Sequence, residues 1–181
     1  MPHICPWWGG YLIDNWVRRW LHNPERILEP YVEPGMTVLD FGCGMGIFSI
    51  AIARMVGDGG QVIAVDVQQQ MLDVLSKRAA KAGVGQRIRT HRCSVDSLDI
   101  DKSVDFALAF YSAHEVPDAE RLLREIHGLL QPKGRFAVVE PVGHVTKSQF
   151  SRMMTLADDV GFQLAERPQV RLSHTAMLVK Q

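Results

Sequence analysis

Cysteine is scarce in this chain of 181 residues, and its pattern argues against two classes of protein. The three cysteines, Cys5, Cys43 and Cys93, are scattered and odd in number, and no Cys-x-x-Cys pair occurs. This pattern argues against both a disulfide framework and a zinc site. We therefore expect reduced thiols, a cytoplasmic location and no bound metal.

An excess of charge and a long apolar run are also missing. Lys and Arg together number 20, as do Asp and Glu, so the formal net charge is zero and no nucleic-acid partner is expected. No stretch is long and apolar enough to span a bilayer, and the first residues lack the basic region and apolar run of a secretory signal. The length suits one domain over residues 1–181, without membrane insertion.

Short apolar stretches alternate with helical patterns through most of the chain. The predicted strands are Thr37 to Phe41, Gln61 to Asp66, Ile88 to Cys93, Asp105 to Phe110 and Arg135 to Glu140. The predicted helices are Ile47 to Val56, Gln69 to Ala82 and Asp118 to Leu130, and a turn is expected at Gln131 to Gly134. This alternation predicts a doubly wound, mostly parallel α/β sheet with helices on both faces.

The rhythm changes towards the C-terminus. Thr146 and Gln149 have the spacing of a capping box, which predicts a helix from there to about Val160. Two strands, Phe162 to Glu166 and Arg171 to Val179, are then expected with only a short connection between them. A short connection favours an antiparallel pair.

The N-terminal segment, residues 1–35, differs from the core at residues 36–181, because all four tryptophans lie in it. Apolar residues between Leu12 and Leu21 share one helical face, so we expect an amphipathic helix that packs on the domain. Residues Cys5 to Gly10 are expected to cover a binding site. For residues 1–10 the sequence leaves both a lid and an interface open.

The stretch VLDFGCGMGIF, from Val38 to Phe48, contains three glycines at alternate positions, directly after an apolar run. A parallel sheet binds ligands at the carboxyl ends of its strands, and glycine allows a ligand to approach the backbone closely. The spacing D-x-G-x-G-x-G differs from the G-x-G-x-x-G of dinucleotide sites. The next strand ends in Asp66, an acid that can accept hydrogen bonds from both ribose hydroxyls of an adenosine-containing cofactor.

Together with AFYSAHEVPD (Ala109 to Asp118) and LLQPKGRFAVVEP (Leu129 to Pro141), these motifs resemble the class I S-adenosylmethionine-dependent methyltransferases. The resemblance covers about residues 36 to 145 and is to the small-molecule, type 11-like branch, which includes quinone C-methyltransferases. It implies a Rossmann-like seven-stranded sheet with an antiparallel C-terminal hairpin. It also implies S-adenosyl-L-methionine as cofactor and S-adenosyl-L-homocysteine as product.

The resemblance carries a set of cofactor-binding residues onto this chain. The glycine loop corresponds to the methionine part of the cofactor, Asp66 to the ribose, and the residues after the third strand to the adenine. At that third position the family commonly has an aspartate, whereas this chain has Ser94, with Asp96 in reserve. The implied residues are Asp40, Gly42, Cys43, Gly44, Gly46, Asp66, Val67, Met71, Ser94, Val95, Phe110 and Tyr111.

Methyl transfer is an in-line displacement, so positioning is the main requirement and a general base is needed only when the acceptor loses a proton. His114 is a candidate base, and the alternative is that it caps the next helix or touches the cofactor. Tyr111 is either a wall of the site or a catalytic hydroxyl. Glu115, Glu140 and His144 are further candidates.

The sequence thus predicts methyl transfer to a small-molecule acceptor. A protein methyltransferase and a non-catalytic cofactor-binding module are the alternatives. The acceptor, its methylated atom and the formation of a homo-oligomer are left open.

Overall fold

The computed structural model describes residues 22–181, so the predictions for the helix between Leu12 and Leu21 and for the lid at Cys5 to Gly10 lie outside the described residues. The strands are β1 (Thr37–Phe41), β2 (Gln61–Asp66), β3 (Ile88–Arg92), β4 (Val104–Phe110), β5 (Leu130–Pro141), β6 (Phe162–Glu166) and β7 (Ser173–Lys180). The helices are α3 (Pro24–Leu28), α4 (Ile47–Val56), α5 (Gln69–Lys81), α6 (Ala119–Leu129) and α7 (Lys147–Val160), with short 3-10 turns η1 (Gly85–Arg87) and η2 (Ala113–Glu115).

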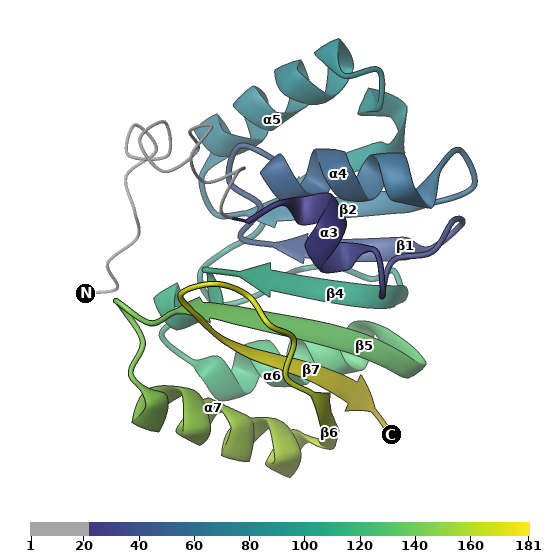
Figure 1. Ribbon diagram of the computed structural model, residues 1–181. Coiled ribbons are helices and arrows are strands. Elements are labelled where there is room, and N and C mark those ends of the chain that lie inside the picture. Colours follow the sequence, from purple (N-terminus) through teal and green to yellow (C-terminus); the bar gives the residue numbers. More distant parts are fainter. Residues whose placement is uncertain (1–21) are drawn as a thin grey trace.

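Within this part of the chain, the seven strands form one sheet in the order β3-β2-β1-β4-β5-β7-β6 (Figure 1). The strands β1 to β5 pair in parallel. The last two strands run antiparallel, with β7 inserted between β5 and β6. The predicted mostly parallel sheet with an antiparallel C-terminal hairpin is therefore confirmed.

Successive residues of one strand enter opposite hydrophobic cores. Val38 of β1 packs in the core that includes residues of α3, α4 and α5, whereas Leu39 packs in the core that includes residues of α6 and α7. Figure 1 shows the two groups of helices on opposite faces of the sheet. Burial on both faces explains why the strands read as continuous apolar runs rather than as alternating patterns.

Two of the predicted helices, α6 and α7, begin with a side-chain cap, whereas α4 and α5 do not. The side chain of Asp118 accepts a hydrogen bond from the N–H of Arg121 at 2.9 Å, which starts α6. At α7, Thr146 and Gln149 form the predicted capping box. Such caps satisfy backbone donors that have no partner within the helix.

The prediction of a turn at Gln131 to Gly134, between a helix and the following strand, is wrong. These residues lie inside β5, which begins at Leu130. Val104 of β4 pairs with Leu130, but Phe106 pairs with Arg135, so the pairing shifts across this stretch. Lys133 has a φ of +65° there. The turn-forming residues therefore produce a bulge within one long strand.

The sheet order positions the site. The chain winds outwards from β1 through β2 to β3 and then returns to place β4 on the other side of β1. Loops after strands on either side of such a reversal diverge and leave a crevice at the carboxyl ends of the strands.

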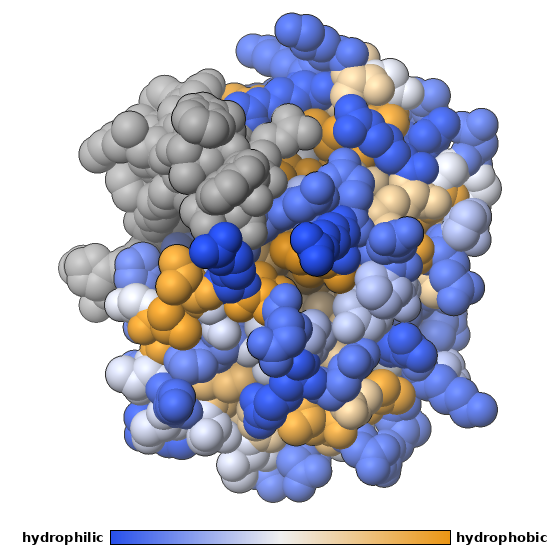
Figure 2. Space-filling view, viewed as in Figure 1, coloured by the Kyte–Doolittle hydropathy of each residue, from blue (hydrophilic) through white to orange (hydrophobic). Residues whose placement is uncertain are grey.

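The surface of the described part is mixed in character. The large hydrophobic side chains exposed there are Val95, Val142, Leu164 and Leu172. In the view of Figure 2, hydrophilic residues separate the hydrophobic patches from one another. Within residues 22–181, no helix combines the length and the apolar character needed to cross a bilayer.

Candidate active site

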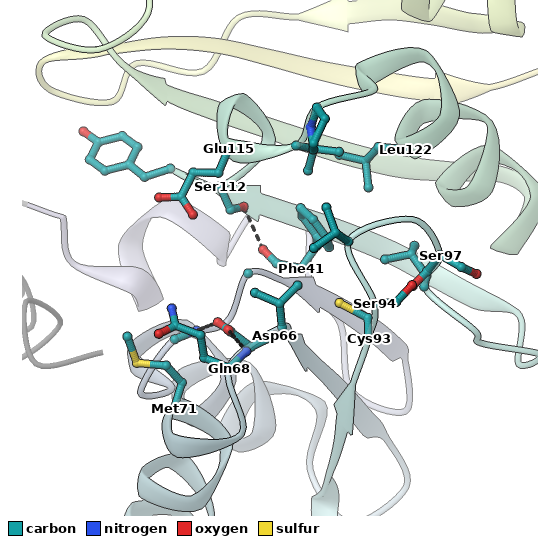
Figure 3. Close-up of a pocket in the computed structure, with 18 of the residues that line it drawn as sticks. Phe41, Asp66, Gln68, Met71, Cys93, Ser94, Ser97, Ser112, Glu115 and Leu122 are labelled. Atoms are coloured by element: carbon teal, nitrogen blue, oxygen red, sulfur yellow. Dashed lines mark hydrogen bonds between the residues drawn. The ribbon is translucent and has the colours of Figure 1, made fainter. Parts of the chain in front are cut away.

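One cavity lies at the carboxyl ends of β1, β2 and β4 (Figure 3). It brings together most of the residues predicted to bind the cofactor, although they come from four separate parts of the chain. The predicted residues that line it are Gly42, Gly44, Asp66, Val67, Met71, Ser94, Val95, Phe110 and Tyr111. Asp40, Cys43, Gly46 and His114 are not among the lining residues.

The glycine loop reaches the cavity with its backbone. Gly44 has a φ of +53°, and a Cβ built on it would meet no other heavy atom within 4 Å, so the cavity extends to the main chain at this residue. Gly42 is different, because a Cβ there would lie 2.3 Å from the Cβ of Ser112. One glycine thus leaves the cavity open, while the other allows the loops after β1 and β4 to pack together.

Asp40, Cys43 and Gly46 do not line the cavity. The side chain of Asp40 is buried and accepts a hydrogen bond of 2.5 Å from the hydroxyl of Ser49, in the first turn of α4. Cys43 is also buried, and burial raises the pKa of its thiol well above the usual value. Gly46 is the N-cap of α4. In this structure these three residues support the loop rather than face the cavity.

The carboxylate of Asp66 is the main acidic group of the lower wall in Figure 3. Its Oδ2 accepts a hydrogen bond from the N–H of Gly44 at 3.0 Å, and its Oδ1 accepts one from the N–H of Gln68 at 2.9 Å. Burial raises the pKa of this carboxyl, and the backbone donors oppose that effect. Because each carboxylate oxygen has two acceptor positions, Asp66 retains capacity for ligand hydroxyls.

The segment after β3 forms another wall. The Ser94 hydroxyl donates to the carbonyl oxygen of Ser97 at 3.3 Å and accepts from the N–H of Asp96 at 3.2 Å. Ser94 and Val95 line the cavity, whereas Asp96 does not. Cys93 lines it too, and burial raises the pKa of its thiol to about 11.

Tyr111 follows β4 in an uncommon backbone conformation, with a φ of +62°. Its hydroxyl lies 2.8 Å from the hydroxyl of Ser173 and 3.1 Å from Nε2 of His22. The residue lines the cavity while its hydroxyl is engaged by groups from the start of β7 and from the N-terminal part of the described chain. This arrangement favours the wall over the catalytic hydroxyl.

His114 lies beside the cavity, next to the lining residue Glu115 in η2. Its Nδ1 is 2.5 Å from Oε2 of Glu140, and its backbone N–H donates to Oε1 of the same side chain at 3.2 Å. The Glu140 side chain is fully buried. The hydrogen bond that His114 donates to Glu140 raises the pKa of His114, and burial opposes this. The ring of His144 is centred 5.8 Å from that of His114.

Several lining residues were not predicted from the sequence. Ser112 donates a hydrogen bond of 2.8 Å to the carbonyl oxygen of Phe41, which ties the loop after β4 to the end of β1. Its place two residues after the predicted strand that ends at Phe110 was the available signal. Arg121 and Leu122 line the cavity from α6, and a helical pattern alone gives no indication of this. The other unpredicted lining residues are Phe41, Gln68, Cys93, Ser97, Leu98, Val116 and Pro117, whereas Glu115, which also lines the cavity, was among the further candidates.

The methyltransferase-domain family matches residues 38–134, which is more than half of the chain. This stretch runs from β1 to the bulge in β5 and contains the whole cavity wall. The chain belongs to this family. A solved structure that shares the fold, described below, is a SAM-dependent methyltransferase, so S-adenosyl-L-methionine is the cofactor of that protein.

Curated relatives carry more specific names. A demethylmenaquinone methyltransferase of Lactobacillus johnsonii is 34% identical over 110 residues, which cover 60% of this chain and 45% of that protein. A 2-phytyl-1,4-naphtoquinone methyltransferase of Synechococcus elongatus is 35% identical over 111 residues, covering 60% of this chain and 47% of that protein. The matched part of the chain thus spans about half the length of these relatives.

A solved structure shares the fold over almost the whole chain. A SAM-dependent methyltransferase from Aquifex aeolicus superposes with a TM-score of 0.88 at 22% identity, covering 98% of this chain and 100% of the other. The likeness supports the Rossmann-like methyltransferase fold.

Proposed function

We propose that this chain transfers a methyl group from S-adenosyl-L-methionine to a small-molecule acceptor. The observation that carries the proposal is the pairing of Gly44 with Asp66 at the cavity, within a chain of the methyltransferase-domain family. Gly44 leaves its backbone open to a ligand, and Asp66 offers a carboxylate to ribose hydroxyls. These two features fit an adenosine-containing cofactor.

The cofactor supplies an electrophilic methyl group on a sulfonium sulfur, and the C–S electron pair stays with sulfur when the methyl group leaves. The chain's own part is to hold the reactants and to exclude competing orientations. We assign the ribose to Asp66, the adenine to Val67, Met71, Ser94 and Val95, and the methionine part to the loop from Asp40 to Gly46. Phe110 and Tyr111 are assigned as walls.

We assign His114 as the proton acceptor for acceptors that lose a proton on methylation. Its Nδ1 is engaged by Glu140, so Nε2 is the nitrogen left to take a proton. A buried carboxylate that orients an imidazole in this way also stabilises the imidazolium formed. Glu140 is therefore a positioning residue in this proposal.

The names of two relatives, a demethylmenaquinone methyltransferase and a 2-phytyl-1,4-naphtoquinone methyltransferase, support an acceptor of quinone type. We propose a small aromatic acceptor of quinol type as the first compound to test. A quinol ring carbon beside a hydroxyl is nucleophilic, and its methylation releases one proton to a base.

The test uses S-adenosyl-L-methionine labelled in its methyl group. The full chain is incubated with 1,4-naphthoquinol and, separately, with cell extract divided by size into small-molecule and protein fractions. Label in the quinol or in the small-molecule fraction, lost in Asp66→Ala, supports the proposal. Label in the protein fraction alone would instead support a protein methyltransferase. Label in no fraction, from protein that binds S-adenosyl-L-homocysteine, would support the non-catalytic module.

We also propose a cytoplasmic location and a single methyltransferase domain. Cys43 and Cys93 are both buried and unpaired by disulfides, which suits a reducing compartment. The zero net charge gives no support for a nucleic-acid partner.

A further inference from the structure

The Ser94–Leu98 segment is a part of the cavity wall without regular secondary structure. It lies between β3 and β4 and belongs to neither strand nor helix. Four of its five residues line the cavity, the exception being Asp96. Its own hydrogen bonds close a tight turn, in which the N–H of Ser94 donates to the carbonyl oxygen of Ser97 at 3.1 Å. Such a turn does not by itself fix the segment relative to the rest of the cavity.

Two side chains of α6 connect this segment to the body of the domain. Nη2 of Arg121 donates to the carbonyl oxygen of Val95 at 2.6 Å. Oε2 of Glu125 accepts from the N–H of Leu98 at 2.7 Å. The segment is therefore held at both of its ends by one helix.

The two side chains also hold each other. Nη1 of Arg121 donates to Oε1 of Glu125 at 2.9 Å, across one turn of the helix. About a quarter of each side chain is exposed, so the pair is largely shielded from water. Arg121 thus binds the segment with one guanidinium nitrogen and Glu125 with another. The planar guanidinium of arginine supports this geometry, whereas the single ammonium group of lysine does not.

We propose that Arg121 and Glu125 position the adenine-binding wall, so that the cofactor meets a pre-formed Ser94–Leu98 segment. The inference rests on the proposed function, because it assigns the adenine to this wall. In this chain Ser94 stands where the family commonly has an aspartate, so the wall has no acidic side chain of its own on the cavity at that position. The wall therefore depends on its shape and its backbone groups, and these are what α6 holds in place.

The binding test compares Arg121→Ala with Arg124→Ala. Arg124 lies on the same helix and pairs with Glu120 at 2.6 Å, but that pair is more exposed and is not at the cavity. Both variants remove one positive charge and one i,i+4 ion pair. Arg121→Ala also leaves the N-cap of α6 intact, because Asp118 bonds the backbone N–H of residue 121.

Calorimetry with S-adenosyl-L-homocysteine is expected to show about fivefold to tenfold weaker binding for Arg121→Ala and an unchanged dissociation constant for Arg124→Ala. Arg121→Lys is expected to recover part of the loss. 5′-Methylthioadenosine shares the adenosine group but lacks the amino acid, so its binding should weaken by the same factor. Equal binding by Arg121→Ala and Arg124→Ala would overturn the inference.

Hydrogen exchange of the protein without cofactor gives a second readout. The amides of Ser94 and Leu98 are expected to exchange several-fold faster in Arg121→Ala and in Glu125→Gln, but not in Arg124→Ala. Unchanged exchange in folded Arg121→Ala would overturn the positioning role, even if the wild type failed to bind S-adenosyl-L-homocysteine. Failure of the wild type to bind would count against the proposed function instead.

Discussion

The carboxylate of Asp66, at the end of β2, accepts a hydrogen bond from the N–H of Gly44, 3.0 Å away in the loop after β1. The two residues lie 22 positions apart in the sequence, and this bond joins them at one edge of the sheet. It fixes the glycine loop against the acid that we assign to the ribose. One hydrogen bond therefore connects the residues that we assign to the ribose and to the methionine part of the cofactor.

Alanine substitutions at Gly44 and Gly83 distinguish the effect of filling the cavity from the effect of backbone strain. Gly44→Ala places a methyl group at the cavity in a left-handed conformation, so we expect about 1–2 kcal/mol lower stability and about tenfold weaker binding of S-adenosyl-L-homocysteine. Gly83, with a φ of +71° and open space around it, is the matched control. Gly83→Ala should show the same loss in denaturant unfolding but normal binding in calorimetry. Similar affinities for the two variants would argue that Gly44 does not face the cofactor.

The hydroxyl of Tyr111 is expected to contribute to stability rather than to chemistry. Tyr111→Phe removes the hydrogen bonds to Ser173 and His22 and should lower the free energy of unfolding by about 0.5–1.5 kcal/mol. Ser173→Ala should have a similar effect, and the double variant should lose less than the sum of the two. Methyl transfer should persist in Tyr111→Phe. A stable Tyr111→Phe variant that binds cofactor but transfers no methyl group would make the hydroxyl catalytic.

The contact between His114 and Glu140 predicts a specific pH dependence. Because Glu140 raises the pKa of His114 above its ordinary 6.5, the folded chain binds more protons than the unfolded chain between those two values. This contribution to stability is complete below pH 6.5 and is lost as pH rises through the folded-state pKa. Glu140→Gln should lower the pKa of His114, measured by NMR titration, and flatten the pH dependence of unfolding.

His127 is an internal control for that titration. Burial lowers the pKa of His127, so this residue should titrate below the ordinary value in the wild type and in Glu140→Gln. An unchanged midpoint for His114 in Glu140→Gln would contradict the contact. If His114 also acts as the base, base-dependent methyl transfer should rise with pH through its midpoint in the wild type and be reduced in Glu140→Gln.

Strand and loop order explain why much of the site could be predicted. Gly44 and Asp66 each follow or end a parallel strand, and parallel strands bring their carboxyl ends to one edge of the sheet. The alternation of apolar strands and helices was enough to place them together. The same reasoning predicted a mostly parallel sheet covered on both faces, because burial on both faces leaves a continuous apolar run in each strand.

Other contacts depend on packing that the sequence does not reveal. Tyr111 meets Ser173 across 62 positions and His22 across 89, and neither pair has a local pattern. The bulge in β5 was missed because its residues have turn chemistry, while the pairing with β4 continues on either side of them. Arg121 was missed because helical periodicity shows which residues are buried but not which loop lies beside the helix.

Binding of S-adenosyl-L-homocysteine by the wild type and Asp66→Ala tests the central claim most directly. Calorimetry should show binding to the wild type, no comparable binding of NAD, and at least about a hundredfold loss in Asp66→Ala, because hydrogen bonds to a charged group are removed. Asp73→Ala, on the exposed part of α5, should bind normally. A folded wild type that does not bind, or an Asp66→Ala variant that binds as well as Asp73→Ala, would contradict the account.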